Sequence, residues 1–258
     1  MSITSEEVKA EAKRWGARIV GIGSVDRWTN APKGHKPKDF LPKARSVVLF
    51  GIPQFKAMAQ WRNFMKGSEM YPEAKVEGFP NRLMAAHQIY ARMQYDGINL
   101  YLQMIATMLG CFLTDRGHNV VTFPPSGGSG ISGMDMVIEM YRFGFHQWSH
   151  RHAAVACGLG ELGMNSGFIC PEYGLRTRLC SLITDAPLVP DPLYKIGDAC
   201  LGPDCDLCVK SCPDPKPHGE IYSYELIPGY EIVTRQMDLR KCGGVYCGKC
   251  MAVCPVGR

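Results

Sequence analysis

The sequence has no long run of Lys and Arg and carries little net charge. Its 29 basic and 24 acidic residues leave +5 at pH 7, so a nucleic-acid-binding tail is not indicated and charge alone names no partner. Low-complexity segments are also missing. With 46% hydrophobic and 21% charged residues in a chain of 258, the composition excludes an intrinsically disordered protein and indicates a folded globular one.

An apolar leader is absent from the first residues, because Met1–Lys13 is charged throughout. This pattern predicts no secretory signal. Twelve cysteines are too few for a disulfide-stapled mini-protein of this length, and eight of them fall within the last 59 residues. We therefore expect a cytoplasmic protein whose thiols stay reduced and bind metals.

Only one segment is long and uncharged enough to be tested as a membrane span, Gly97–Thr114. Its polar members recur every three or four residues, as on one stripe of a helix: Asn99, Gln103, Thr107, Gly110 and Thr114. We expect a helix buried inside a soluble domain and no membrane span.

Helix and strand signals alternate along the first part of the chain. Thr4 and Glu7 form a capping box that starts a helix over Ser5–Trp15. The other expected elements are strands at Ala17–Gly21, Ser46–Ile52, Asn119–Phe123, Gly167–Cys170 and Arg178–Thr184, and helices at Asn81–Asp115, Met134–Phe143 and Ser149–Cys157. Such alternation predicts an α/β (α+β) sandwich. The glycine-rich loop Pro124–Gly133 is either a flexible connector or a loop whose backbone can come close to a bound ligand.

A domain boundary is predicted where proline and aspartate punctuate the chain, between Asp185 and Pro192. Residues 1–195 then form one domain and residues 196–258 a cysteine-rich module. This module repeats one spacing, C-x4-C-x2-C-x3-C-P. The first copy is Cys200, Cys205, Cys208 and Cys212, and the second is Cys242, Cys247, Cys250 and Cys254.

The end of each copy, C-x2-C-x3-C-P, is the core of the bacterial ferredoxin signature for [4Fe-4S] clusters. In two-cluster ferredoxins the fourth cysteine of each run binds the other cluster. We therefore assign Cys200, Cys205, Cys208 and Cys254 to a first cluster, and Cys212, Cys242, Cys247 and Cys250 to a second. The alternative is two tetrahedral zinc sites with four cysteines each.

The other four cysteines have no ligand spacing among themselves: Cys111, Cys157, Cys170 and Cys180. We interpret them as buried core thiols. The alternative is that Cys170 and Cys180, on neighbouring strands, line a reactive cavity.

The segment from Trp148 to Gly167 resembles the central part of reductive dehalogenases and, more distantly, of epoxyqueuosine reductases. The similarity continues through Pro171–Leu179 and Ile183–Leu188 into the cysteine module, with a weaker match at Gly16–Gly23. It implies a nitroreductase-like domain that holds cobalamin or another corrinoid, followed by a ferredoxin-like module with two [4Fe-4S] clusters. Electrons would reach cobalt, and reduced cobalt would remove a halide or an oxygen from a small organic substrate.

The resemblance places the corrinoid near a short glycine-rich region, whose expected residues are Gly158, Leu159, Gly160, Gly163 and Tyr173. It also implies an electron donor such as a ferredoxin or a flavodoxin, and it is compatible with a homodimer. The sequence shows neither the twin-arginine signal of exported dehalogenases nor the helical-repeat extension of epoxyqueuosine reductases. We therefore expect neither export nor a nucleic-acid substrate.

Reductive bond cleavage also needs a proton donor beside the metal. The acidic residue of epoxyqueuosine reductases aligns with Gly144 and is not carried over. The local candidates are Tyr141, His146, His150 and His152, with Arg178 to hold an anion; the alternative is that they form a satisfied helix face and ordinary packing. A second hypothesis for the whole protein is a corrinoid-free electron-transfer protein that reduces a partner, such as a corrinoid protein.

Overall fold

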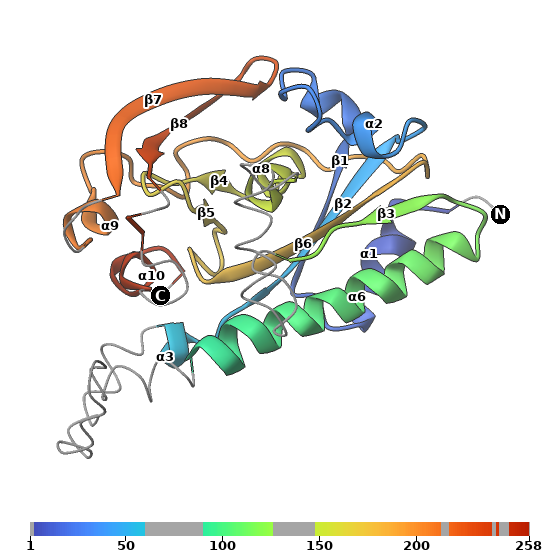
Figure 1. The fold of residues 1–258 in the computed structure, drawn as a ribbon, viewed down its shortest axis with the longest axis horizontal. Helices are drawn as coiled ribbons and strands as arrows, with labels where there is room; N and C mark the ends of the chain where they lie inside the picture. The colour runs from blue at the N-terminus through green and yellow to red at the C-terminus, as the bar shows by residue number, and fades with distance from the viewer. Residues whose placement is uncertain are drawn as a thin grey trace.

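Four strands that are far apart in the sequence form the central sheet of the protein (Figure 1). The computed structural model describes residues 3–59, 90–125, 148–212, 217–238, 241–242 and 248–257. The strand order is β1-β2-β6-β3, and every neighbouring pair is antiparallel. The strands are β1 (Ile19–Ser24), β2 (Ser46–Pro53), β3 (Val120–Thr122) and β6 (Thr177–Thr184).

The two central strands are buried on both faces. In β2 the side chains alternate, so that Val47 and Leu49 join one hydrophobic cluster while Val48 and Phe50 join another. β6 pairs with β2 in register, with Val48 opposite Leu182, and seven of its eight residues are buried. A strand with helices on both faces reads as a continuous apolar run. The run Ser46–Ile52 was recognisable as a strand for this reason.

Two helices cover one face of the sheet, α1 (Ser5–Arg14) and α6 (Gly97–Thr114). The predicted capping box is confirmed, because the Thr4 side chain accepts from the Glu7 N–H and the Glu7 carboxylate accepts from the Thr4 N–H at 2.8 Å. α6 follows a π-helical segment, η3 (Tyr90–Asp96), and packs against β6 and β3. The predicted helix Asn81–Asp115 is confirmed at its C-terminal end, and residues 81–89 of it lie outside the described residues.

The burial pattern of α6 differs from the prediction. Asn99 lies on the expected polar stripe but is fully buried, because its side-chain oxygen accepts from Arg178 Nε at 3.2 Å. Leu100 and Met104 are half exposed instead. One helix in the described part of the chain, Arg92–Thr114, is long and apolar enough to cross a membrane, and 39% of its most apolar window is buried. The buried residues of α6 lie on one side of the helix, so only one of its faces belongs to the core.

On the other face of the sheet lies α8 (His150–Ala156), which contacts β2, β6 and the short strands β4 (Glu161–Leu162) and β5 (Phe168–Ile169). The Ser149 side chain caps the α8 N-terminus by accepting from the His152 N–H. Trp28 and Trp148 stack at 5.7 Å between ring centres in this layer. Two short segments complete it, η1 (Val25–Trp28) and α2 (Pro37–Phe40).

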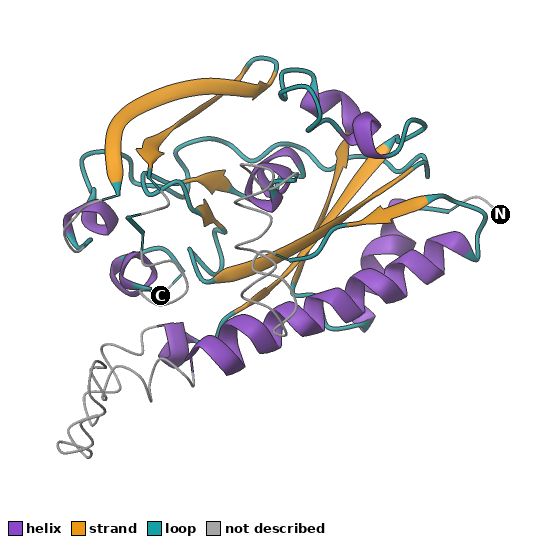
Figure 2. Ribbon diagram, in the orientation of Figure 1, coloured by secondary structure: helices purple, strands orange, loops and turns teal. Residues whose placement is uncertain are grey.

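The cysteine-rich end contains a long hairpin, β7 (His218–Ile227) and β8 (Tyr230–Met237), and two very short helices, α9 (Leu207–Lys210) and α10 (Lys249–Val253). Loops fill most of the chain between β6 and β7 (Figure 2). Across the sheet from the hairpin, α3 (Lys56–Ala59) lies beside η3. The hairpin was not predicted, although the alternating Tyr222, Tyr224 and Leu226 before Pro228-Gly229 are typical of one.

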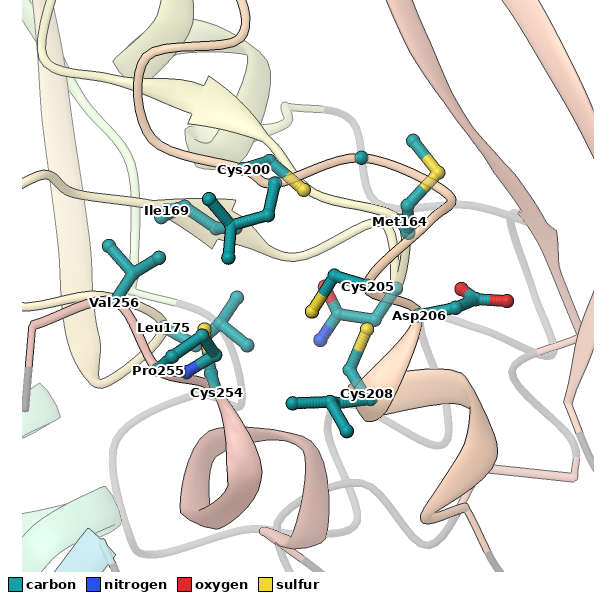
Figure 3. Close-up of a pocket in the computed structure, with 14 residues that line it drawn as sticks. Met164, Ile169, Leu175, Cys200, Cys205, Asp206, Cys208, Cys254, Pro255 and Val256 are labelled. Carbon is teal, nitrogen blue, oxygen red and sulfur yellow. The ribbon is translucent and has the colours of Figure 1, made fainter.

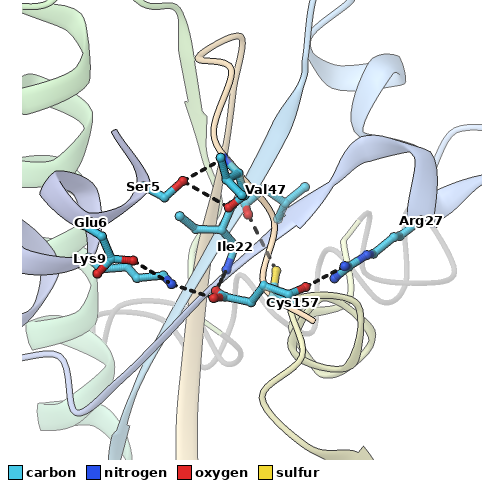
Figure 4. Close-up of polar contacts among 9 residues, drawn as sticks. Ser5, Glu6, Lys9, Ile22, Arg27, Val47 and Cys157 are labelled. Carbon is cyan, nitrogen blue, oxygen red and sulfur yellow. Dashed lines mark hydrogen bonds and ion pairs between the residues drawn. The ribbon is translucent and has the colours of Figure 1, made fainter. Parts of the chain in front are cut away.

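The segment predicted as a domain boundary, Asp185–Pro192, is fastened to the sheet (Figure 4). Asp191 is the main attachment, since its carboxylate accepts from Lys9 Nζ at 2.6 Å and from the Ile22 N–H at 2.8 Å. Arg27 donates to the carbonyl oxygens of Ala156 and Asp191, both at 2.6 Å. The chain that leads to the cysteine module is therefore held in place before the first cysteine. The boundary at residue 195 itself stays a prediction.

The outcome for the remaining predicted segments is mixed. Strands Arg178–Thr184 and Ser46–Ile52 and the helix Ser149–Cys157 are confirmed within one or two residues as β6, β2 and α8. The expected helix Met134–Phe143 and most of the loop Pro124–Gly133 lie outside the described residues. Among the four unpaired cysteines, Cys157, Cys170 and Cys180 are buried, but Cys111 is exposed on α6, so the core-thiol interpretation was wrong for it.

Candidate metal centre

Four cysteines from both halves of the module line one pocket, Cys200, Cys205, Cys208 and Cys254 (Figure 3). The rest of the wall is largely apolar and includes Met164, Ile169, Leu175 and Val256, which come from the chain before the module and from its last residues. The empty space, including its open side, is about 370 Å³. These are the four cysteines that the ferredoxin spacing assigns to the first cluster.

The backbone around Cys205 and Cys208 places both thiols at the start of α9. Asp206 lies between them in the left-handed region, with φ of 43°, and its carbonyl oxygen accepts from the N–H groups of Val209 and Lys210 at 3.1 and 2.9 Å. The Asp206 carboxylate accepts a hydrogen bond from Arg235 Nη2 on β8 at 2.8 Å. This tight turn is what lets two cysteines three residues apart face one pocket.

Cys254 enters the pocket from the far end of the second copy. It is the C-terminal cap of α10 and donates its backbone N–H to the Cys250 carbonyl oxygen at 3.2 Å. α9 and α10 contact each other. Each short helix thus carries a cysteine of one predicted set and is followed by a cysteine of the other set: Cys208 and Cys212 on α9, Cys250 and Cys254 on α10.

The second set is only partly within the described residues. Cys212, Cys242 and Cys250 are half-buried, and Cys247 lies outside the described residues. Within the described parts of the chain, no three His, Cys, Asp or Glu side chains approach closely enough to hold one metal ion. A tetrahedral zinc site would need its thiolates roughly 3.8 Å apart, as Zn–S bonds of about 2.3 Å require. The four thiols of the first set instead surround a space.

The electrostatics of this pocket favour a cationic occupant. Burial, together with the neighbouring Cys250, raises the pKa of the Cys208 thiol to about 12. A thiolate in such surroundings needs a nearby positive charge, because desolvation penalises the charged form. Iron or another metal would supply that charge and bind the deprotonated sulfur. The residues present therefore fit a thiolate-bound metal cluster.

The loop that delivers Cys200 is held by a residue that sequence reasoning missed. Glu161 in β4 is buried and accepts backbone N–H groups from Gly197, Ala199 and Cys200. The signal was present in the sequence, since Glu161 is the only charged residue between Gly158 and Gly163. A lone charge in an apolar, glycine-rich turn indicates a specific partner.

Comparison with known proteins gives a consistent picture. No family model matches the sequence. A tetrachloroethene reductive dehalogenase of Desulfitobacterium hafniense is 30% identical over 289 aligned positions, which cover 97% of this chain and 47% of the relative. An epoxyqueuosine reductase of Listeria monocytogenes is 32% identical over 112 positions, covering 41% of this chain and 28% of the relative.

The fold agrees with solved structures of both kinds. A selenomethionine-labelled epoxyqueuosine reductase aligns with a TM-score of 0.62 at 18% identity, over 98% of this chain and 65% of that one. A reductive dehalogenase described as B12-dependent aligns with a TM-score of 0.59 at 19% identity, over 98% of this chain and 32% of that one. The chain belongs to the reductive dehalogenase and epoxyqueuosine reductase superfamily. It spans about half the length of the Desulfitobacterium relative.

In this protein, the glycines of the predicted corrinoid region allow close packing of the chain. Gly158 has φ of 75°, and a Cβ there would lie 2.0 Å from the Pro192 carbonyl oxygen. A Cβ at Gly160 would lie 2.1 Å from the Ile169 carbonyl oxygen, and one at Gly163 would lie 2.5 Å from the Ile169 side chain. These glycines let neighbouring segments of the protein's own chain approach. Corrinoid binding stays a prediction for the residues of this region: Gly158, Leu159, Gly160, Gly163 and Tyr173.

Among the predicted catalytic residues of this superfamily member, His150 and Arg178 are anchored in the scaffold. His150 Nε2 donates to the Pro124 carbonyl oxygen at 2.8 Å, which leaves Nδ1 to accept from Ser181 Oγ at 2.9 Å. The Arg178 guanidinium lies 3.9 Å from the centre of the Tyr95 ring. Tyr141 and His146 lie outside the described residues. Neither His150 nor Arg178 lines the cysteine pocket.

His152 has a different position, because it joins α8 to the hairpin. Its Nδ1 lies 2.7 Å from Ser149 Oγ and its Nε2 lies 2.5 Å from the Tyr224 hydroxyl on β7. Burial, together with the positive charge of Arg151, lowers the pKa of His152 to about 4. The imidazole is therefore neutral at pH 7. A catalytic role for it stays a prediction.

Proposed function

We propose that this chain is an iron–sulfur oxidoreductase that passes electrons through two [4Fe-4S] clusters to corrinoid cobalt. The reduced cobalt would be used to cleave a carbon–halogen or carbon–oxygen bond in a small organic substrate by reduction. In this proposal residues 1–195 form a nitroreductase-like domain and residues 196–258 a ferredoxin-like one. The proposal rests on the named activities of relatives that share the whole length of this chain.

One observation carries the iron–sulfur part. Cys254, 42 residues after Cys212 in the sequence, lines the same pocket as Cys200, Cys205 and Cys208. A fourth ligand from the other motif is the arrangement of two-cluster ferredoxins. Independent zinc ribbons would take all four ligands from one copy of the spacing.

The contact between α9 and α10 favours electron transfer between two clusters. Each helix carries a predicted ligand of one cluster and is followed within two residues by a predicted ligand of the other. The two clusters would therefore be linked through both short helices. Such a pair carries single electrons from a donor at the surface to an acceptor inside the protein. We propose a small reduced protein, such as a ferredoxin or a flavodoxin, as that donor.

The corrinoid part of the proposal rests on the relatives. When bound, a corrinoid supplies a low-valent cobalt that delivers electrons to the bond being broken. The described glycines of the predicted corrinoid region are covered by the protein's own chain. No step of the mechanism is therefore assigned to described residues of this region.

Metal analysis of protein purified anaerobically from cells supplied with cobalamin tests the proposal, together with an ultraviolet-visible spectrum. We expect about eight iron per chain and stoichiometric cobalt. Turnover of halogenated and epoxide-like compounds would then be screened with a chemical reductant. About eight iron without cobalt would replace the proposal by the electron-transfer hypothesis. A colourless protein with about two zinc would overturn both.

A further inference from the structure

Glu161 is a buried carboxylate whose contacts all point to the beginning of the cysteine module. Only 4% of its surface is exposed. Oε2 accepts from the Gly197 N–H at 2.7 Å, while Oε1 accepts from the Ala199 N–H at 2.8 Å and from the Cys200 N–H at 2.5 Å. Three charge-assisted hydrogen bonds therefore fix the loop that ends in the first predicted ligand.

The negative charge of Glu161 has no basic partner. Among the described residues, no Lys, Arg or His side chain forms an ion pair with it, and its only hydrogen-bond donors are the three backbone N–H groups. A buried charge without a counter-ion is costly unless it is fully hydrogen-bonded. A glutamine or an apolar side chain would avoid that cost. The position therefore indicates a use for the charge itself.

Glu161 is also next to the pocket. A second cavity of about 610 Å³, including its open side, is lined by both Glu161 and Cys200, and it shares Met164 and Gly202 with the cysteine pocket. We propose that Glu161 is a positioning residue for the first cluster, which it serves in two ways. It holds Cys200 in place, and its fixed negative charge lowers the reduction potential of that cluster. This inference rests on the proposed iron–sulfur function.

The direction of the effect follows from electrostatics. Reduction adds an electron to the cluster, and a nearby buried anion disfavours that added charge. Glu161 also takes up the N–H groups of Ala199 and Cys200, which are then not available to donate to cluster sulfur. Hydrogen bonds to sulfur raise the potential of such clusters. Both effects lower the reduction potential of the first cluster and make it a stronger reductant than it would be without Glu161.

The substitution Glu161→Gln separates charge from position. The amide oxygen of glutamine can keep the bonds to Ala199 and Cys200, while its NH₂ group faces Gly197 and loses one bond. Glu231→Gln is the matched control, because Glu231 lines the same second cavity but is exposed. Both variants lose one negative charge at the second cavity. Only Glu161 contacts the loop that ends in Cys200.

The readout is a redox titration of the anaerobically purified protein, followed by electron paramagnetic resonance of the reduced clusters. We expect Glu161→Gln to keep the wild-type iron content and to raise the potential of one cluster only. Glu231→Gln should leave both potentials unchanged. Two unshifted potentials in Glu161→Gln, or equal shifts in the two variants, would overturn the proposed effect of the Glu161 charge on the first cluster. A wild-type protein without clusters would instead overturn the proposed function, so the two failures are distinguishable.

Glu161→Ala tests the other half of the proposal. It leaves the N–H groups of Gly197, Ala199 and Cys200 without their acceptor, so the loop before Cys200 should lose its fixed conformation. We expect this variant to lose about half of its iron, from about eight to about four per chain, because only one cluster depends on Cys200. Wild-type iron content in a folded Glu161→Ala protein would contradict the role of Glu161 in holding Cys200. If this variant does not fold, the Glu161→Gln titration still decides whether the Glu161 charge acts on the first cluster.

Discussion

The sheet and the cysteine-rich end of this protein are stabilised in different ways. β2 and β6 are buried along nearly their whole length between two hydrophobic clusters. At the other end, α9 buries none of its four residues, α10 buries only Ala252, and β7 is mostly exposed before Leu226. Elements this short, with so little apolar burial, are not stable by packing alone. In the proposed function, the metal clusters would supply the stability that packing does not give to the cysteine-rich end.

The largest expected effect is the loss of a cluster on substitution of Cys254. Cys254→Ala should remove the first cluster and about half of the iron, even though Cys254 belongs to the second copy of the motif. Hydrogen exchange followed by mass spectrometry should show faster exchange in α9, α10 and the loop at Cys200, with β2 and β6 unchanged. Cys111→Ala, at an exposed cysteine on α6, is the control and should change neither iron content nor exchange.

A core substitution should have the opposite regional effect. Phe50 is fully buried between β2 and α6, so Phe50→Ala is expected to lower the free energy of unfolding by about 3–5 kcal/mol. Urea unfolding followed by far-ultraviolet circular dichroism measures this change. Phe55→Ala, at a phenylalanine that is 67% exposed, should stay within about 0.5 kcal/mol. Equal losses in the two variants would contradict the importance of burial for the sheet.

The contact between His152 and Tyr224 joins the two regions and should depend on pH. The folded pKa of about 4 is below the ordinary 6.5, so the unfolded chain binds the proton first. Stability should therefore fall as the pH decreases from about 6.5 to about 4. The contribution is at most about 3 kcal/mol. His152→Gln should show a smaller difference between unfolding free energies at pH 7 and pH 5, and an unchanged difference would be evidence against this titration.

The smallest expected effect is local to the first helix, far from the cysteines. Thr4→Ala removes the capping side chain of α1 and should cost about 1 kcal/mol. Lys13→Ala, in the last turn of the same helix, should cost less than about 0.5 kcal/mol. The loss of unfolding free energy is measured by thermal unfolding of the sheet. The cluster absorbance should not change in either variant, and a change would show that the two regions are coupled.

Local signals predicted the elements whose causes are local. The capping box at Thr4, the apolar run at Ser46–Ile52 and the helix at Ser149–Cys157 each depend on residues close together in the sequence, and the structure has all three elements. The spacing of the cysteines predicted which four line the first pocket, because a short repeat of this kind restricts where a chain can turn. The hairpin was not predicted, although the alternation of Tyr222, Tyr224 and Leu226 in β7 is a local signal for a strand.

Long-range contacts account for the features that sequence reasoning missed or misassigned. Asn99 was assigned to the polar stripe of its helix, and the hydrogen bond from Arg178 on β6 explains how its amide can be buried. His152 was one of several similar candidates until the fold brought Tyr224 to it from 72 residues away. Glu161 was passed over because its three donors lie 36 to 39 residues further along the chain.

The sequence by itself determined the doubled cysteine motif, the resemblance to a superfamily of reductases and the helices and strands with local signals, because each depends on residue types at short spacing. Only the tertiary structure decided which side chains surround the first pocket, which carboxylate holds its ligand loop and which face of α6 is buried. The physical reason is that hydrogen bonds and burial depend on distance in space, and the chain that separates these partners carries no signal of how it will fold back.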